Sequence, residues 1–186
     1  MSSFVNHQET LVTIGQCWSK QPHQGFPHQL SPFTGTKTVC YAIAPEAQHV
    51  IYTHARETPA VEVGGLLLGE VYQQGTRYLV QVTHALPARH TEARAVAVTF
   101  TSDTWLDLIA SRARYPDNMT VGWYHSHPGM GVFLSGQDLF THRSFFADKP
   151  WYLALVIDPQ FGEQGVFVWE KNKVVSAPLL SVLEPG

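Results

Sequence analysis

The chain has only two cysteines, Cys17 and Cys40, and few charged residues, which make up 15% of its 186 residues. Two thiols are too few for a disulfide framework or a cysteine-rich zinc site, so we expect a cytoplasmic protein in a reducing compartment. The sequence has no apolar run of membrane-spanning length and no basic segment followed by an apolar block near its start. We therefore expect neither a membrane partner nor a signal peptide.

An excess of positive charge is also absent. The formal net charge is −3 at pH 7, and the isoelectric point is about 6.3. Proteins that bind nucleic acid mainly through its phosphates carry basic surfaces, so this balance argues against nucleic acid as the main partner. Charged residues make up roughly a quarter of a typical domain, and a surface with fewer of them is consistent with partial cover by protein partners.

The length fits one domain with a core of its own. Residues 1–36 are rich in Gln, His, Pro and Ser, and we interpret them as an N-terminal extension and a candidate partner-binding arm. Residues 37–175 are expected to form the folded domain, and residues 176–186 a C-terminal tail.

Apolar periodicity and turn residues predict the elements of this domain. The predicted strands are 38–43, 61–71, 77–86, 95–100, 119–124, 151–157 and 165–169, with a polar loop at 87–94. The predicted helices are 44–58, 102–114 and 135–146. Strands and helices mix without a regular βαβ repeat, so the expected fold class is α+β, a mixed α/β arrangement with a curved sheet.

The most informative stretch runs from Trp123 to Asp138 and reads WYHSHPGMGVFLSGQD. His125 and His127 stand one residue apart at the end of an apolar run. Side chains on a strand alternate faces, so both imidazoles should point the same way. Asp138 follows a glycine-rich loop that can fold back toward the histidines. Two imidazoles and one carboxylate leave a fourth tetrahedral position for water, which is the design of a catalytic zinc site.

Two further residues suit a zinc hydrolase, which needs a base and a donor to the developing oxyanion. Glu62 stands at the mouth of an apolar, glycine-containing run, where a carboxylate without a partner is costly and therefore more often functional. Ser135 lies close enough to Asp138 in sequence to offer its hydroxyl to an oxyanion. Ser135 and Asp138 also have the spacing of a helix capping box, and this alternative does not exclude the first.

Other interpretations find less support. A His-x-His pair alone is often two histidines on a polar strand face. His142, one helical turn after Asp138, could support the metal ligands from behind, but we expect it at the surface. Ser144 has no evident base, and neither cysteine lies in an activating setting. The sequence contains neither the deaminase signature nor His-Glu-x-x-His. A zinc hydrolase built on the first motif is the hypothesis that these exclusions leave.

Taken together, these residues resemble the JAMM (MPN+) family of zinc metalloproteases, of the Mov34/JAB type. The family pattern is an upstream Glu, then His-x-His-Pro, six residues, and Ser-x-x-Asp. It occurs here as Glu62, His125-Ser126-His127-Pro128 and Ser135-Gly136-Gln137-Asp138, with six residues between the last two groups. The motif region is most similar to that of the proteasome-lid deubiquitinase and the signalosome deneddylase, and the resemblance covers roughly residues 38–171.

This resemblance implies a fold and a set of roles. The fold would be an MPN/cytidine-deaminase-like curved mixed sheet flanked by helices. The implied roles are metal ligand for His125, His127 and Asp138, general acid/base for Glu62, and oxyanion donor for Ser135. The short interval after Asp138 leaves no room for the zinc-binding insertion of the endosome-associated members, so we expect one Zn²⁺ per chain.

The implied reaction is hydrolysis of the amide or isopeptide bond after the C-terminal glycine of ubiquitin or a ubiquitin-like modifier. In this family the modifier's tail lies as an added strand along a loop between the Glu and His segments. Here that loop would be about residues 87–96, and the substrate-binding candidates are Arg89, His90, Thr91, Glu92, Ala93, Arg94, Ala95 and Val96. An ordinary hairpin connection is the alternative for any one of them.

Three activities remain open within the resemblance. The first is a deubiquitinase-like isopeptidase, and the second is a processing peptidase that matures a ubiquitin-like or sulfur-carrier precursor. The third is an inactive MPN scaffold, which is disfavoured because such scaffolds lose ligands, whereas every ligand position here is filled. We find none of the long C-terminal helices of the proteasome and signalosome members in this sequence. We therefore expect a free-standing or prokaryotic-type enzyme that works with ubiquitin-like activation and conjugation proteins.

Overall fold

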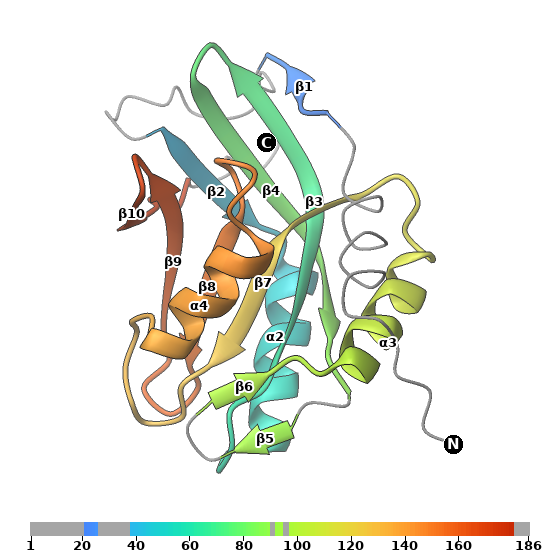
Figure 1. The fold of residues 1–186 in the computed structure, drawn as a ribbon, viewed down its shortest axis with the longest axis vertical. Coiled ribbons are helices and arrows are strands. Elements are labelled where there is room, and N and C mark those ends of the chain that lie inside the picture. The colour runs from blue at the N-terminus through green and yellow to red at the C-terminus, as the bar shows by residue number, and fades with distance from the viewer. Residues whose placement is uncertain (1–20, 26–37, 90–91, 95–96, 181–186) are drawn as a thin grey trace.

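A strongly curved mixed sheet runs through the computed structural model, which describes residues 21–25, 38–89, 92–94 and 97–180 (Figure 1). The strands are β1 (His23–Gln24), β2 (Val39–Ile43), β3 (Gly64–Gln74), β4 (Arg77–Pro87), β5 (Glu92–Arg94), β6 (Ala97–Thr99), β7 (Met119–Ser126), β8 (Leu153–Asp158), β9 (Glu163–Glu170) and β10 (Lys173–Ser176). The helices described are α2 (Pro45–Glu57), α3 (Ser102–Arg112) and α4 (Gly136–Phe145). The expected α+β class with a curved mixed sheet is confirmed.

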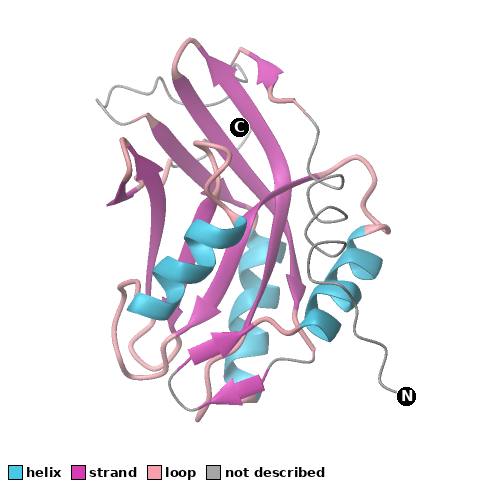
Figure 2. Ribbon diagram, viewed as in Figure 1, coloured by secondary structure: helices cyan, strands magenta, loops and turns pink. Residues whose placement is uncertain are grey.

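The strands of the large sheet follow the order β10-β9-β8-β7-β3-β4-β2, and β1 pairs with β3. Strand β3 is antiparallel to both β4 and β7, whereas β7 and β8 run parallel, as do β2 and β4. Helix α2 lies behind this sheet and α4 in front of it in the view of Figure 2. The parallel pair β7 and β8 places two C-terminal strand ends side by side, and the motif begins there.

The centre of the sheet is buried on both faces. All residues of β7 and β8 are buried, and Leu66, Leu67 and Leu68 of β3 are at most 2% exposed. Apolar residues at successive positions are typical of a strand that is covered on both sides. Burying one leucine side chain contributes roughly 1.5–3 kcal/mol, so these strands form a rigid support for the residues at their ends.

The helices begin where their capping residues predict. Pro45 opens α2, where its missing N–H costs no hydrogen bond. Ala47, Ile51 and Ala55 recur every four residues and are buried, so they form the face that packs on the sheet. Helix α3 begins after Thr101, whose side chain accepts a hydrogen bond from a backbone N–H of the first turn.

No helix among the described residues is long and apolar enough to cross a membrane.

The polar loop predicted at 87–94 is only partly a loop. Strand β4 continues through Pro87, and β5 occupies Glu92–Arg94. It pairs antiparallel with β6, which is shorter than the strand predicted at 95–100. Strands of three residues are too short to show an alternation of apolar and polar side chains, so their sequence cannot be told from that of a loop.

Strand β10 was not predicted, and it extends the sheet beyond β9. The two strands are joined at Lys171 and Asn172, whose φ angles of 48° and 65° lie in the left-handed region. Lysine is an uncommon residue in such a turn, so the hairpin carries a weak sequence signal.

The chain after β10 also contacts the sheet, because the backbone N–H of Leu180 donates to the carbonyl of Tyr41 in β2. The domain boundaries themselves stay predictions.

Gly69 lies in β3 at a shift in the pairing register with β4. A Cβ atom there would stand 1.8 Å from the carbonyl oxygen of Gln81. The substitution Gly69→Ala should therefore destabilise the fold by about 3 kcal/mol, because backbone rather than a flexible side chain must move. Thermal unfolding should record a fall in Tm of about 6–12 °C.

The matched control is Gly136→Ala in the first turn of α4, where an added Cβ atom meets nothing within 4 Å. Its Tm should stay within about 2 °C of that of the unsubstituted protein, since alanine suits a helix better than glycine. An equal Tm for both variants would contradict the proposed close approach.

Candidate metal centre

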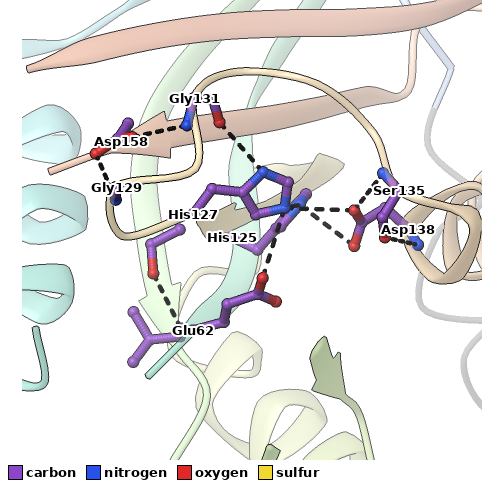
Figure 3. Close-up of polar contacts among 10 residues, drawn as sticks. Glu62, His125, His127, Gly129, Gly131, Ser135, Asp138 and Asp158 are labelled. Atoms are coloured by element: carbon purple, nitrogen blue, oxygen red, sulfur yellow. Dashed lines mark hydrogen bonds and ion pairs between the residues drawn. The ribbon is translucent and has the colours of Figure 1, made fainter. Parts of the chain in front are cut away.

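The two histidines of the motif lie at the C-terminal end of β7. Pairing with β8 continues past the strand end, where the backbone N–H of His127 donates to the carbonyl of Ile157 at 2.8 Å. The side chains of His125 and His127 leave the backbone on the same face, and their Nε2 atoms are 3.1 Å apart (Figure 3). Both rings are buried. The alternation of side chains along a strand thus brings two imidazole nitrogens to one point.

Asp138 reaches the histidines from the first turn of α4. Ser135 caps this helix, because its hydroxyl oxygen accepts from the backbone N–H of Asp138 at 3.3 Å and Asp138 Oδ2 accepts from the Ser135 N–H at 2.7 Å. The same carboxylate places Oδ1 3.3 Å from Nε2 of His125 and Oδ2 3.4 Å from Nε2 of His127. The capping box is therefore present, and it aims the carboxylate at the imidazoles.

These three side chains fit a tetrahedral metal ion. Each of His125, His127 and Asp138 offers one ligand atom, and these atoms lie within 4.8 Å of one another. Ligand atoms about 2.0–2.1 Å from a tetrahedral zinc ion stand about 3.3 Å apart. The two Nε2 atoms are 3.1 Å apart. Oδ1 of Asp138 lies 3.3 Å from Nε2 of His125, and its other oxygen, Oδ2, lies 3.4 Å from Nε2 of His127. Two imidazoles and one carboxylate are also ligands that zinc accepts.

Burial and mutual contact set the charges of the three groups. Burial lowers the pKa of His125, which favours the neutral imidazole that a metal ion requires. Burial opposes the charge of Asp138, but hydrogen bonds from both histidines hold the pKa of its carboxyl well below the usual range. Burial also lowers the pKa of His127, yet contacts with Asp138 and Glu62 outweigh it and raise that pKa. Metal binding must therefore displace a proton from His127 in acid.

An aromatic platform supports His125. Its ring stacks on the indole of Trp123, with ring centroids 4.5 Å apart and planes 11° from parallel. Trp123 in turn donates its Nε1–H to Nδ1 of His142 at 3.2 Å. The expectation that His142 lies at the surface is wrong, since its side chain is fully buried and stacks on Trp169. Burial lowers the pKa of His142 to about 4, which keeps the ring neutral and able to accept this hydrogen bond.

Glu62 enters the same site from the segment before β3. Its side chain is 2% exposed, and Oε1 lies 3.7 Å from Nε2 of His127. The strand begins at Gly64, so Glu62 precedes it rather than opening it. The next residue, Val63, pairs with Ser126 in two ways: its N–H donates to the serine Oγ at 3.0 Å, and its carbonyl accepts from the serine N–H at 2.9 Å. Ser126 thus holds the backbone that carries Glu62.

The importance of Ser126 was not predicted. It stands between the two histidines, so alternation along the strand turns its side chain to the opposite face, away from the metal ligands. Strand alternation could have shown that Ser126 faces away from the ligands. That Val63 is its partner could not be predicted without knowing that β3 pairs with β7.

The predicted substrate-binding residues lie along the end of β4 and the small hairpin. Arg89 is exposed and lines a cavity of about 670 Å³ that is bordered by α2, the end of β4 and the end of α3. Glu92, Ala93 and Arg94 form β5. His90, Thr91, Ala95 and Val96 lie outside the described residues. A role for any of the eight in binding a substrate stays a prediction.

Comparisons with known proteins identify related sequences. Residues 36–150 match the family model described as JAB1/Mov34/MPN/PAD-1 ubiquitin protease. The 26S proteasome regulatory subunit RPN11 of Eremothecium gossypii is 34% identical over 149 residues, covering 78% of this chain and 46% of the relative. The ubiquitin carboxyl-terminal hydrolase RPN11 of Saccharomyces cerevisiae is 35% identical over 137 residues, covering 71% and 43%.

A signalosome protein is similar too. The COP9 signalosome complex subunit 5 of Gibberella zeae is 39% identical over 109 residues, covering 57% of this chain and 31% of the relative. The chain therefore spans at most about half the length of the curated relatives it matches. Among solved structures, protein DSY2949 from Desulfitobacterium hafniense has a TM-score of 0.58 at 20% identity, with 75% of this chain and 90% of that chain covered. At this identity the likeness shows the fold alone.

The geometry predicts that the protein binds one zinc ion per chain, with His125, His127 and Asp138 as ligands. Zinc at about 100 times its Kd should stabilise the fold by about 2.7 kcal/mol, which raises Tm by about 5–11 °C. Elemental analysis and thermal unfolding, each with and without a chelator, measure this.

The variant His127→Ala should lose both the bound ion and the zinc-dependent rise in Tm. The control is His49→Ala, which removes an exposed histidine of α2 and should keep both. Less than about half an equivalent of zinc in the unsubstituted protein, unrestored by added zinc, would contradict the assignment.

Proposed function

The chain belongs to the JAB1/Mov34/MPN/PAD-1 family, which is the JAMM/MPN+ family, and we propose that it is a zinc-dependent isopeptidase of the deubiquitinase type. It hydrolyses the bond after the C-terminal glycine of ubiquitin or a ubiquitin-like modifier. The single observation that supports this most strongly is the convergence of two imidazoles and a carboxylate at 3.1–3.4 Å, with a second buried carboxylate, Glu62, beside them.

His125, His127 and Asp138 would hold the zinc ion. When bound there, zinc supplies a Lewis acid that polarises the scissile carbonyl and lowers the pKa of water toward roughly 7. The protein's own contribution is to bury these ligands and present them in one orientation before substrate arrives. The pairing of β7 with β3 and β8 provides that rigidity.

Glu62 is the general acid/base of the proposed reaction. Its carboxylate takes a proton from the attacking water and returns it to the amine nitrogen of the leaving lysine, so that the amine departs neutral. The side chain is buried, and the double hydrogen bond between Val63 and Ser126 fixes the backbone beside it. A base held in this way loses little orientational freedom when the reaction occurs.

Ser135 stabilises the oxyanion that forms at the scissile carbonyl. Its hydroxyl oxygen accepts the backbone N–H of Asp138, and this contact leaves the hydroxyl proton available to donate. A hydrogen-bond donor held in place in this way lowers the activation free energy most when it faces the atom on which negative charge develops. The capping role of Ser135 and its catalytic role thus use different parts of one hydroxyl group.

The names of the relatives support the proposed substrate class. One is a ubiquitin carboxyl-terminal hydrolase, and others are subunits of the 26S proteasome and the COP9 signalosome. We propose that the modifier's tail is added as a strand beside β5, along residues 89–96. Proteins of the conjugation pathway would be associated partners. We place the protein in the cytoplasm, which fits the buried free thiol of Cys40.

The substitution Glu62→Gln tests the base. It removes the proton acceptor but keeps the shape of the side chain, so zinc content should be unchanged while kcat falls by at least about 100-fold. The control Glu163→Gln changes an exposed acid in β9 and should keep full activity. Full activity in Glu62→Gln would show that another group is the base.

The substrates for this test are a lysine-linked ubiquitin conjugate and a linear ubiquitin fusion. Cleavage of the conjugate supports an isopeptidase, whereas cleavage of the linear fusion alone indicates a processing peptidase. No cleavage of either by a zinc-loaded protein supports an inactive scaffold.

The substitution Ser126→Ala tests the support of Glu62. It leaves the buried Val63 N–H without its acceptor, which should cost about 1–3 kcal/mol of stability. Because Glu62 is released while the ligands stay, kcat should fall more than zinc affinity does. Ser176→Ala, at an exposed position of β10, is the control. Equal kcat values for Ser126→Ala and Ser176→Ala would remove Ser126 from this role.

A further inference from the structure

A buried carboxylate outside the proposed ligand set lies at the end of β8. The side chain of Asp158 is fully buried and accepts four backbone N–H groups. Its Oδ1 accepts from Gly129 at 3.1 Å, from Gln160 at 2.9 Å and from Phe161 at 3.3 Å. Its Oδ2 accepts from Gly131 at 2.8 Å. Burial opposes its charge, but these amides hold the pKa of the carboxyl below its usual range.

Two of these contacts have a local explanation, and two do not. Gln160 and Phe161 are the second and third residues after Asp158, and both donate their backbone N–H to its carboxylate. An Asp side chain that accepts from these positions closes a local turn. Gly129 and Gly131 instead lie 29 and 27 residues away in the sequence, in the loop that follows His127. A buried charge is costly unless it is fully hydrogen-bonded, so the carboxylate binds that loop firmly to the end of β8.

The loop needs such a support, because its backbone is unusual. Gly129 and Gly131 have φ angles of 73° and 82°, in the left-handed region that favours glycine. In this conformation the carbonyl of Gly131 faces the ring of His127, 3.3 Å from Nδ1 (Figure 3). A carbonyl oxygen can only accept, so Nδ1 must carry the proton in this contact. In the neutral imidazole, a proton on Nδ1 leaves the lone pair of Nε2 available to a metal ion.

We propose that Asp158 is a positioning residue for His127. By holding the N–H of Gly131, it aims the carbonyl of the same residue at Nδ1 and so fixes both the ring orientation and the tautomer that ligates zinc. Such outer contacts to a ligating histidine commonly change metal affinity by about 10–100-fold. The inference rests on the proposed function in one respect, namely that His127 is a zinc ligand.

The second ligand offers an internal comparison. Nδ1 of His125 has no hydrogen-bond partner among the residues that the structure describes, and its ring is held by stacking on Trp123 instead. The two histidines are therefore oriented by different means. A change at Asp158 should disturb His127 and leave His125 in place.

The substitution Asp158→Asn breaks one contact selectively. In the variant, the amide oxygen can take the place of Oδ1 and still accept three N–H groups. The amide NH₂ group then takes the place of Oδ2 and faces the N–H of Gly131, and because both are donors this hydrogen bond is lost. We expect the Kd for zinc to rise about 10–100-fold, measured by competition with a chromophoric chelator. With Co²⁺ in place of zinc, the visible ligand-field bands should shift or weaken. The control is Asp148→Asn, whose side chain is 64% exposed and which should match the unsubstituted protein.

A second measurement needs no variant. In the zinc-loaded, ¹⁵N-labelled protein, Nδ1 of His127 should carry a slowly exchanging proton, whereas Nε2 should show the chemical shift of a metal-bound nitrogen. In folded Asp158→Asn, this proton should exchange faster. The His125 signals should not move.

The possible outcomes separate the two hypotheses. If the unsubstituted protein takes up no zinc, the proposed function fails. If it binds zinc and Asp158→Asn has the same Kd and the same Co²⁺ spectrum, the positioning role is overturned while the proposed function stands. If Asp158→Asn does not fold, the spectrum of the unsubstituted protein decides, because a His127 that binds zinc through Nδ1 also overturns the role.

Discussion

The pairing of β7 between β3 and β8 is the constraint on which the rest of the molecule depends. The part of β3 that pairs with β7 and the whole of β8 are buried with it, so the C-terminal end of β7 is held on both sides. Each neighbour brings one further group to that end. The segment before β3 brings Glu62, through the contacts of Val63 with Ser126, and the end of β8 brings Asp158. Side chains that are far apart in sequence thus take fixed positions without depending on a flexible loop.

Three buried carboxylates surround this strand end, and each is compensated differently. Asp138 is held by two imidazoles and the N–H of Ser135, Asp158 by four backbone amides, and Glu62 lies near His127. Burying a charge costs solvation energy even where it is paired or hydrogen-bonded, so this concentration of acids supports a chemical role for the site rather than a stabilising one. A bound divalent cation would offset part of that cost, which links the proposed metal to the stability of the fold.

Helix α4 shows where sequence patterns were insufficient. Its buried residues are Asp138, Thr141 and His142, none of which is aliphatic, so the helix does not present the apolar stripe by which a buried face is recognised. His142 was therefore expected at the surface. Strands β5 and β10 were missed for another reason, since short strands and an unusual turn residue, Lys171, carry little periodic signal. The long central strands were predicted within a few residues, because continuous apolar runs are a strong signal.

The sequence by itself determined which residues are candidates for the metal site. Strand alternation predicted that His125 and His127 share a face, and the spacing of Ser135 and Asp138 allowed the helix capping box that the structure contains. Only the tertiary structure decided which distant residues support them. The contact of Asp158 with the loop after His127 depends on strand order and helix packing, as does the hydrogen bond between His142 and Trp123. Those contacts are set by the burial of the whole core, and no local pattern of residues encodes them.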